Sequence, residues 1–220
     1  MTVVKICGII RLEDALAAAE AGADMIGLNF YRKSPRFIEV EAATLLCSQL
    51  RAELGAECPL IVGLFVNEIV GRISITMERV GFKYVQLSGD ESTEMLRELK
   101  GTAYKAIRPR TRDEALSDIA YFSPDFSTDA RIPSILVDAY HPDLYGGTGE
   151  GTNSEVAKAA RDAVPRLMLA GGLTPENVAA RVSAIQPWGV DVASGVENGA
   201  PGVKDAAKMR DFVMAVRGNN

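Results

Sequence analysis

Short apolar runs alternate with longer amphipathic segments over most of this chain. Within residues 12–21, the apolar side chains recur every three or four positions, as they do on one face of a helix. The apolar runs have the length and composition of buried strands. We predict strands over residues 3–7, 25–29, 60–66, 84–87, 103–107, 135–138, 166–170 and 189–193. We predict helices over residues 12–21, 40–53, 69–80 and 203–217.

Strands that alternate with helices indicate parallel strands joined by right-handed crossovers. Eight such units of about 27 residues each account for the 220 residues. We therefore predict an α/β fold in which residues 1–220 form a single (βα)8 TIM barrel domain of parallel strands. The main alternative is a doubly wound open sheet. That fold would place a G-x-G-x-x-G turn after the first strand, and no such motif occurs there. Within the barrel prediction, the connection over residues 121–133 fits the repeat least well.

The composition is that of an ordinary globular protein, with 47% hydrophobic residues. A net charge of −5 without a basic stripe argues against a nucleic-acid surface. Residues 1–5 lack the features of a signal peptide, and no apolar run approaches the ~18 residues of a membrane span. We expect a cytoplasmic protein with no membrane partner. Three cysteines without C-x-x-C spacing, and a single histidine, argue against a metal site.

Glycine turns follow the last two predicted strands. Gly171 and Gly172 precede a Thr-Pro pair that suits a helix start, and Ser194 and Gly195 follow the final strand. Glycine lets backbone N–H groups approach an anion closely, and a helix start adds positive charge. In barrels of this kind a phosphate often lies at the loops after strands seven and eight. The two turns therefore form a candidate phosphate site, and the alternative is a pair of tight turns without a ligand.

A thiol and a carboxylate end two predicted strands at the mouth of the barrel, where the chemistry of such folds is located. Cys7 ends the first strand and Asp138 the sixth. The pair suits proton abstraction on one face of a substrate and proton donation on the other. Lys5 points to the same side of its strand as Cys7, so its charge would lower the pKa of the thiol. The alternatives are that Cys7 is a small buried side chain and that Asp138 caps the next loop.

Three further polar residues lie near the predicted mouth. Arg36 follows the second strand, and its guanidinium suits a carboxylate bound through two parallel hydrogen bonds; the alternative is a solvated loop arginine. His141 lies in a loop rich in Pro, Gly and Asp, where a solvated side chain is favoured over a catalytic one. Asp191 lies within the eighth strand, and it either orders the site or pairs with Lys5.

Seven short motifs stand out along the chain: KICG at 5–8, FYxKSPR at 30–36, GLFVN at 63–67, VQL at 85–87, GGTG at 146–149, AGGLxPEN at 170–177 and VDVxSGVE at 190–197. Together and in this order they resemble the phosphoribosylanthranilate isomerase family, which belongs to tryptophan biosynthesis. The resemblance covers nearly the whole chain. One motif alone would not be specific, but several in the same order are.

The resemblance implies a (βα)8 barrel without a cofactor and an Amadori rearrangement of N-(5'-phosphoribosyl)anthranilate. In the family's mechanism a carboxylic acid protonates the ribose ring oxygen, the ring opens to an iminium, and a cysteine removes the proton from C2. By motif match Asp138 is the acid, Cys7 is the base and Arg36 holds the anthranilate carboxylate.

The resemblance also implies that the phosphate is held by the backbone of three glycine turns, near Gly147, Gly172 and Gly195. The partner would be a small phosphoribosyl molecule, and the protein a monomer or a homodimer. The residues themselves and the resemblance together give the complete set of expected substrate-binding residues, which is Lys5, Arg36, Gln86, Gly147, Gly171, Gly172, Asp191, Ser194 and Gly195.

The chain departs from the family pattern at two places. The family usually has histidine after the VQL motif, and this chain has Ser88, which cannot become a cation. The family also tends to continue GGTG with Lys-Thr-Phe-Asp-Trp, whereas here Glu150 follows. Because neither change removes the acid, the base or the arginine, the reaction class stands. The alternatives are an isomerase of a related phosphosugar and a phosphosugar-binding barrel without catalysis. Relatives that act on aminoimidazole ribonucleotides use two aspartates, and the thiol in the first strand argues against them.

Overall fold

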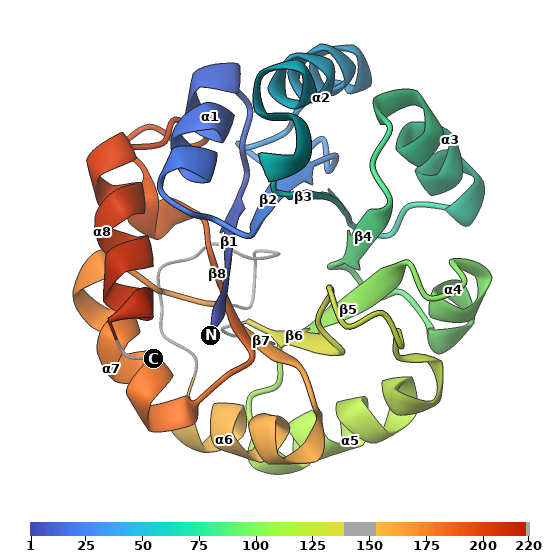
Figure 1. The fold of residues 1–220 in the computed structure, drawn as a ribbon. Helices are drawn as coiled ribbons and strands as arrows, with labels where there is room; N and C mark the ends of the chain where they lie inside the picture. Colours follow the sequence, from blue (N-terminus) through green and yellow to red (C-terminus); the bar gives the residue numbers. More distant parts are fainter. Residues whose placement is uncertain (139–152, 219–220) are drawn as a thin grey trace.

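The alternation of strands and helices closes into a barrel (Figure 1). The computed structural model describes residues 1–138 and 153–218. The strands are β1 (Val3–Cys7), β2 (Met25–Asn29), β3 (Leu60–Phe65), β4 (Tyr84–Leu87), β5 (Ala103–Ile107), β6 (Ile135–Val137), β7 (Leu167–Leu169) and β8 (Gly189–Val192). The α-helices within the described residues are α1 (Leu12–Glu20), α2 (Val40–Leu54), α3 (Val70–Val80), α4 (Thr93–Glu98), α5 (Arg112–Phe122), α6 (Ser154–Ala163), α7 (Pro175–Ile185) and α8 (Ala206–Arg217). Short 3-10 turns are η1 (Gly55–Glu57), η2 (Ser123–Asp125) and η3 (Ser194–Val196).

Each strand pairs in parallel with the next one along the chain, and β1 pairs with β8 to close the barrel. The helices form a ring around the outside (Figure 1). The predicted (βα)8 architecture is therefore confirmed. Because all strands are parallel, their carboxyl ends meet at one face, which places the loops after the strands around a common mouth.

The element bounds differ from the predicted ones mostly by a single residue, and the largest difference lies before α8. This helix begins at Ala206 rather than at residue 203, because the carboxylate of Asp205 accepts hydrogen bonds from the backbone N–H groups of Ala207 and Lys208 as an N-cap. The predicted start of α7 is confirmed, since Thr174 is its N-cap and Pro175 its first residue. The connection after α5 contains η2 and no further strand.

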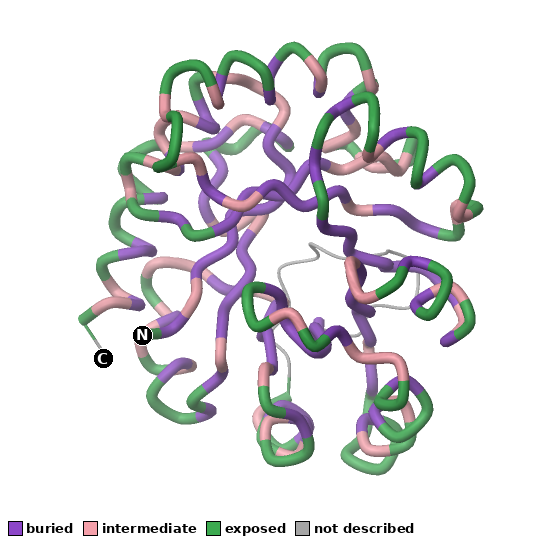
Figure 2. Tube along the Cα trace, turned by 45° about the vertical axis from the view of Figure 1, so that its right-hand side comes forward, coloured by how far each residue is buried: buried purple, intermediate pink, exposed green. Residues whose placement is uncertain are grey.

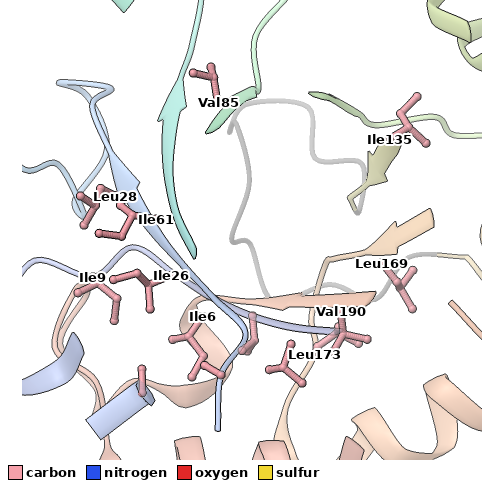
Figure 3. Packing of buried hydrophobic residues seen from close by; sticks show 14 of the residues in the cluster. Ile6, Ile9, Ile26, Leu28, Ile61, Val85, Ile135, Leu169, Leu173 and Val190 are labelled. Atoms are coloured by element: carbon pink, nitrogen blue, oxygen red, sulfur yellow. The ribbon is translucent and has the colours of Figure 1, made fainter. Parts of the chain in front are cut away.

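Apolar packing occupies two shells, because successive side chains of a strand point to opposite faces of the sheet. The larger shell lies between barrel and helices and includes Ile6, Ile26 and Leu28, as Figure 3 shows. The smaller shell fills the inside of the barrel with residues such as Tyr84 and Met168. In Figure 2 the strands are almost wholly buried, whereas the helices alternate between buried and exposed positions. No helix in the described part of the chain has the length and apolarity needed to cross a membrane.

The two shells predict how a core substitution will act. Leu28 is fully buried in the outer shell, whereas Leu45 on α2 is 60% exposed, so the same substitution can be compared at both. We expect Leu28→Ala to lower the free energy of unfolding by about 2–5 kcal/mol, since it removes buried methyl groups and leaves a cavity. Leu45→Ala should change it by less than about 0.5 kcal/mol. Denaturant titrations followed by circular dichroism measure both, and equal effects would contradict the assigned packing.

Candidate active site

A cavity of about 290 Å³ opens at the carboxyl ends of the strands, where the βα loops meet. Its wall combines residues from all eight units of the barrel. The sequence-predicted residues that line it are Cys7, Arg36, Gln86, Asp138, Gly171, Gly172, Asp191 and Ser194. Gly195 and Lys5 are not part of the wall, and Gly147 lies outside the described residues, as do His141 and Glu150.

Cys7 and Lys5 lie next to each other on the inner face of β1. A Cβ atom added to Gly27 of β2 would come within 2.7 Å of the Cys7 Sγ and 3.2 Å of the Lys5 Nζ. The neighbouring strand therefore has room for both side chains only because residue 27 is glycine. Cys7 is 6% exposed and lines the cavity.

Lys5 is fully buried below the cavity wall, and its ammonium group is held by two acceptors. Its Nζ donates to Oδ1 of Asp191 at 3.0 Å and to Oε1 of Gln86 at 2.8 Å. The pairing that the sequence left open for Asp191 is thus present, and Asp191 also lines the cavity. The Lys5 side chain has no exposed surface and is not part of the cavity wall, so its expected contact with a substrate stays a prediction.

The amide of Gln86 connects this ion pair to Ser88. Its Oε1 also accepts a hydrogen bond from the Tyr104 hydroxyl at 3.0 Å, so its Nε2 faces the other way and donates to Oγ of Ser88 at 3.0 Å. Ser88, which stands where the family usually has histidine, lines the cavity together with Arg108. The Arg108 side chain donates from Nη1 to the carbonyl oxygen of Ser88 at 2.8 Å.

The charge of Lys5 acts to lower the pKa of Cys7, as expected from the sequence, but burial acts more strongly in the opposite direction. The pKa of the thiol is therefore above its ordinary value. For Lys5, burial acts to lower the pKa, but the carboxylate of Asp191 and further interactions outweigh it, and the pKa is raised. Lys5 therefore remains a cation beside a thiol that is mostly protonated at neutral pH.

Asp138 follows the last residue of β6 and is 9% exposed at the cavity wall. Its backbone N–H donates to the carbonyl oxygen of Ile107 at 3.0 Å, which continues the β5–β6 ladder by one residue. The backbone of this aspartate is therefore fixed by the sheet. Cys7 and Asp138 enter the cavity from strands that lie well apart around the closed barrel.

The glycine turn after β7 has the geometry expected of an anion site. Gly171 and Gly172 have φ of +92° and +61°, which favour glycine, and neither N–H donates a backbone hydrogen bond to another described residue. The side-chain amide of Asn177 holds the turn by donating to the carbonyl oxygen of Gly172 at 2.8 Å. A side chain at Gly195 would collide with the carbonyl oxygen of Leu173, so this glycine lets the turns after β7 and β8 pack together.

Arg36 is not a solvated loop residue. Its Nε and Nη2 donate to the two carboxylate oxygens of Glu197 at 2.7 and 2.8 Å, and only 12% of its side chain is exposed. Gly8 makes room for it, since a Cβ atom there would lie 2.5 Å from the Cδ of Arg36. The expected two-pronged contact with a ligand carboxylate therefore cannot use this edge of the guanidinium.

Sequence reasoning missed three residues that organise the site, namely Tyr104, Lys204 and Glu197. Lys204 is buried and donates from Nζ to the carbonyl oxygen of Ala193 at 2.9 Å and to Oε1 of Glu197 at 3.0 Å. For Glu197, the available signal in the sequence was its place at the end of the SGVE motif. Among the described residues, no group of three or more His, Cys, Asp and Glu side chains gathers as metal ligands would.

The same chain resembles proteins of one family along nearly its whole length. The profile of the family described as N-(5'phosphoribosyl)anthranilate (PRA) isomerase matches residues 4–215. The N-(5'-phosphoribosyl)anthranilate isomerase of Trichlorobacter lovleyi is 44% identical over 213 residues, which cover 97% of each chain.

Solved structures give the same result. The crystal structure of phosphoribosyl anthranilate isomerase from Thermotoga maritima superposes with a TM-score of 0.84 at 34% identity, over 99% of this chain and 100% of that one. A phosphoribosyl anthranilate isomerase in complex with reduced 1-(o-carboxyphenylamino)-1-deoxyribulose 5-phosphate gives 0.81 at 33% identity, over 99% and 100%. Because the family profile and the relatives match almost end to end, this chain belongs to the N-(5'-phosphoribosyl)anthranilate isomerase family of enzymes.

Proposed function

We propose that the protein converts N-(5'-phosphoribosyl)anthranilate to 1-(2-carboxyphenylamino)-1-deoxyribulose 5-phosphate in tryptophan biosynthesis, with Asp138 as general acid and Cys7 as general base. The observation that carries the assignment of residues is that both side chains line one cavity, together with the turn at Gly171 and Gly172. Family membership supports the reaction, and one relative has been crystallised with a reduced form of the same product.

The proposed reaction begins at the ribose ring. The carboxylic acid of Asp138 donates its proton to the ring oxygen, the bond between this oxygen and C1 breaks, and the nitrogen lone pair forms an iminium at C1. The thiolate of Cys7 then takes the proton from C2, and the electrons of that C–H bond form a C1–C2 double bond as the iminium nitrogen is neutralised. Tautomerisation of this enol to the ketone at C2 places a proton on C1. Hydrogen moves only within substrate and protein, so the rearrangement requires no redox cofactor.

The separation of β6 and β1 fits the different roles proposed for Asp138 and Cys7. In the closed barrel β7 and β8 lie between β6 and β1 on one side, so Asp138 and Cys7 approach a bound sugar from different directions. One group can therefore donate to the ring oxygen while the other reaches C2. Positioned acids and bases typically contribute 10²- to 10⁴-fold each.

Lys5 supports the base without contacting the ligand. Burial makes a thiolate at Cys7 unfavourable, and the Lys5 ammonium beside it reduces that cost. Asp191 and Gln86 hold the ammonium in place. We therefore assign Lys5 as a positioning residue of the base rather than as a binding residue.

The phosphate of the substrate would lie at the turns after β7 and β8, where Gly171, Gly172 and Ser194 line the cavity. Gly195 permits the close packing of these turns, and the sequence motif adds Gly147. With a net charge of −5, the protein is expected to bind this small anion locally and not nucleic acid. We further propose that the protein is cytoplasmic, that it consists of a single barrel domain, and that it is a monomer or a homodimer.

The first prediction concerns the acid and the base. Asp138→Asn cannot donate the carboxyl proton and Cys7→Ser has a far weaker base, so each should lower kcat by about 10²- to 10⁴-fold with little change in KM. The measurement is the change in anthranilate-type fluorescence when the protein meets freshly made N-(5'-phosphoribosyl)anthranilate. Near-full turnover by either variant would show that its assigned role is wrong, and no turnover by the folded wild type would point to another phosphosugar or to binding alone.

The second prediction concerns Lys5 and the pKa of Cys7. In Lys5→Met the charge that lowers this pKa is absent, so alkylation of Cys7 by iodoacetamide at a fixed pH should slow by about tenfold, and its pH midpoint should rise. Mass spectrometry of the Cys7 peptide follows the reaction. Cys47 is buried, so its alkylation in the same sample shows whether the variant is partly unfolded. Lys83→Met, which removes an exposed lysine, is the matched control. Faster alkylation of Cys7 with Cys47 unchanged would contradict the assignment.

The third prediction concerns Arg36, which we propose binds the anthranilate carboxylate. Arg36→Ala removes a contact made equally in the ground state and the transition state, so KM should rise by about tenfold or more while kcat changes little. Steady-state kinetics separate the two constants. A fall in kcat at unchanged KM would instead place Arg36 in the chemical step.

A further inference from the structure

The carboxylate of Glu197 connects the loop after β8 to the loop after β2, whose strands flank β1 in the closed barrel. It is 6% exposed, and its Oε1 accepts hydrogen bonds from Arg36 Nε, Lys204 Nζ and the backbone N–H of Gly202 at 2.7, 3.0 and 2.9 Å. Its Oε2 accepts from Arg36 Nη2 at 2.8 Å. Burial acts to raise the pKa of Glu197, but these donors together lower it, so the group is ionised at neutral pH.

The hydrogen bonds leave one edge of Arg36 available. A guanidinium carries five N–H groups in a planar fork, and Glu197 occupies the edge formed by Nε and Nη2. The second edge is formed by Nη1 and the other hydrogen of Nη2. Among residues 1–138 and 153–218, Nη1 donates to no acceptor, and Arg36 lines the cavity.

The charges of the cluster match a ligand with one further carboxylate. Arg36, which is partly buried, and Lys204, which is buried, are two cations that share one anion, Glu197. The three side chains therefore carry a net charge of +1, which a single carboxylate on the ligand would balance. A guanidinium can bind a second carboxylate in its own plane through the edge that remains.

We propose that Glu197 is a positioning residue that fixes the plane of Arg36 and thereby directs its remaining edge at the carboxylate of the anthranilate ring. The inference rests on the proposed function, and it adds a residue that acts only through Arg36. It also explains why an arginine already paired with a glutamate can still take a carboxylate ligand.

Positioning and simple charge balance predict opposite effects of Glu197→Gln on the affinity for a ligand that carries a carboxylate. The substitution raises the net charge of the cluster from +1 to +2, so charge alone would strengthen the binding of an anionic ligand. The amide of Gln, however, presents an N–H₂ group to one of the Arg36 donors. Two donors cannot share a hydrogen bond, so the guanidinium must rotate away from its plane.

The test compares the binding of two product analogues by titration calorimetry. One is reduced 1-(o-carboxyphenylamino)-1-deoxyribulose 5-phosphate, and the other is the same compound without the carboxyl group. We expect Glu197→Gln to weaken the first about tenfold and the second less than about twofold. Glu41→Gln, which removes an exposed ion pair with Arg79 on the helix layer, is the matched control and should change neither.

A double substitution shows whether Glu197 acts through Arg36. In an Arg36→Ala background, Glu197→Gln should have no further effect on the carboxylated analogue, whereas independent roles would add. Equal weakening of both analogues, or tighter binding of the carboxylated one, would overturn the proposal. Failure of the proposed function appears separately, as a folded wild type that binds both analogues but does not turn over N-(5'-phosphoribosyl)anthranilate.

Discussion

The ion pair of Lys5 and Asp191 is the interaction on which the site depends, because it lies inside the barrel at the seam where β1 meets β8. The two residues are partners in the register of that seam. Burying two charges is costly unless both are paired and hydrogen-bonded, and here Gln86 supplies the additional acceptor. A slip of one residue between β1 and β8 would turn one of the charges toward the apolar shell under the helices. The pair thus specifies how the barrel closes, and Cys7 is positioned two residues further along the same strand.

Local patterns in the sequence were sufficient to predict the architecture and the end of the barrel at which the candidate site lies. The period of the apolar runs gave the strands, and the Thr174–Pro175 pair gave the start of α7. The rule that chemistry lies at the carboxyl ends of barrel strands selected Cys7 and Asp138, both of which line the cavity. These inferences needed only information from neighbouring residues, together with one general property of the fold.

Pairings over long sequence separations were only partly accessible from the sequence. It left the Lys5–Asp191 pair as one of two alternatives for Asp191, and it did not suggest the Arg36–Glu197 pair. Lys5 and Asp191 are 186 positions apart, and Arg36 and Glu197 are 161 apart. Their partners follow from the closure of the barrel and from loop geometry, which no local pattern encodes. The direction of the Cys7 pKa shift also depends on burial, a property of all the strands together, and the positive charge of Lys5 alone suggested the opposite direction. The sequence showed only that Ser88 departs from the family's usual histidine, whereas the structure shows that its hydroxyl accepts a hydrogen bond from Nε2 of Gln86.

The burial of Cys7 has a consequence for the durability of the protein. Thiolates, not thiols, react with peroxides, and the rate also depends on access to the sulfur. A cysteine that is 6% exposed, with a pKa above its ordinary value, is therefore protected from oxidation. Oxidation to the sulfinic or sulfonic state would be irreversible and would remove the base that we propose for the reaction. The environment that makes Cys7 difficult to ionise thus also makes its thiol resistant to oxidation.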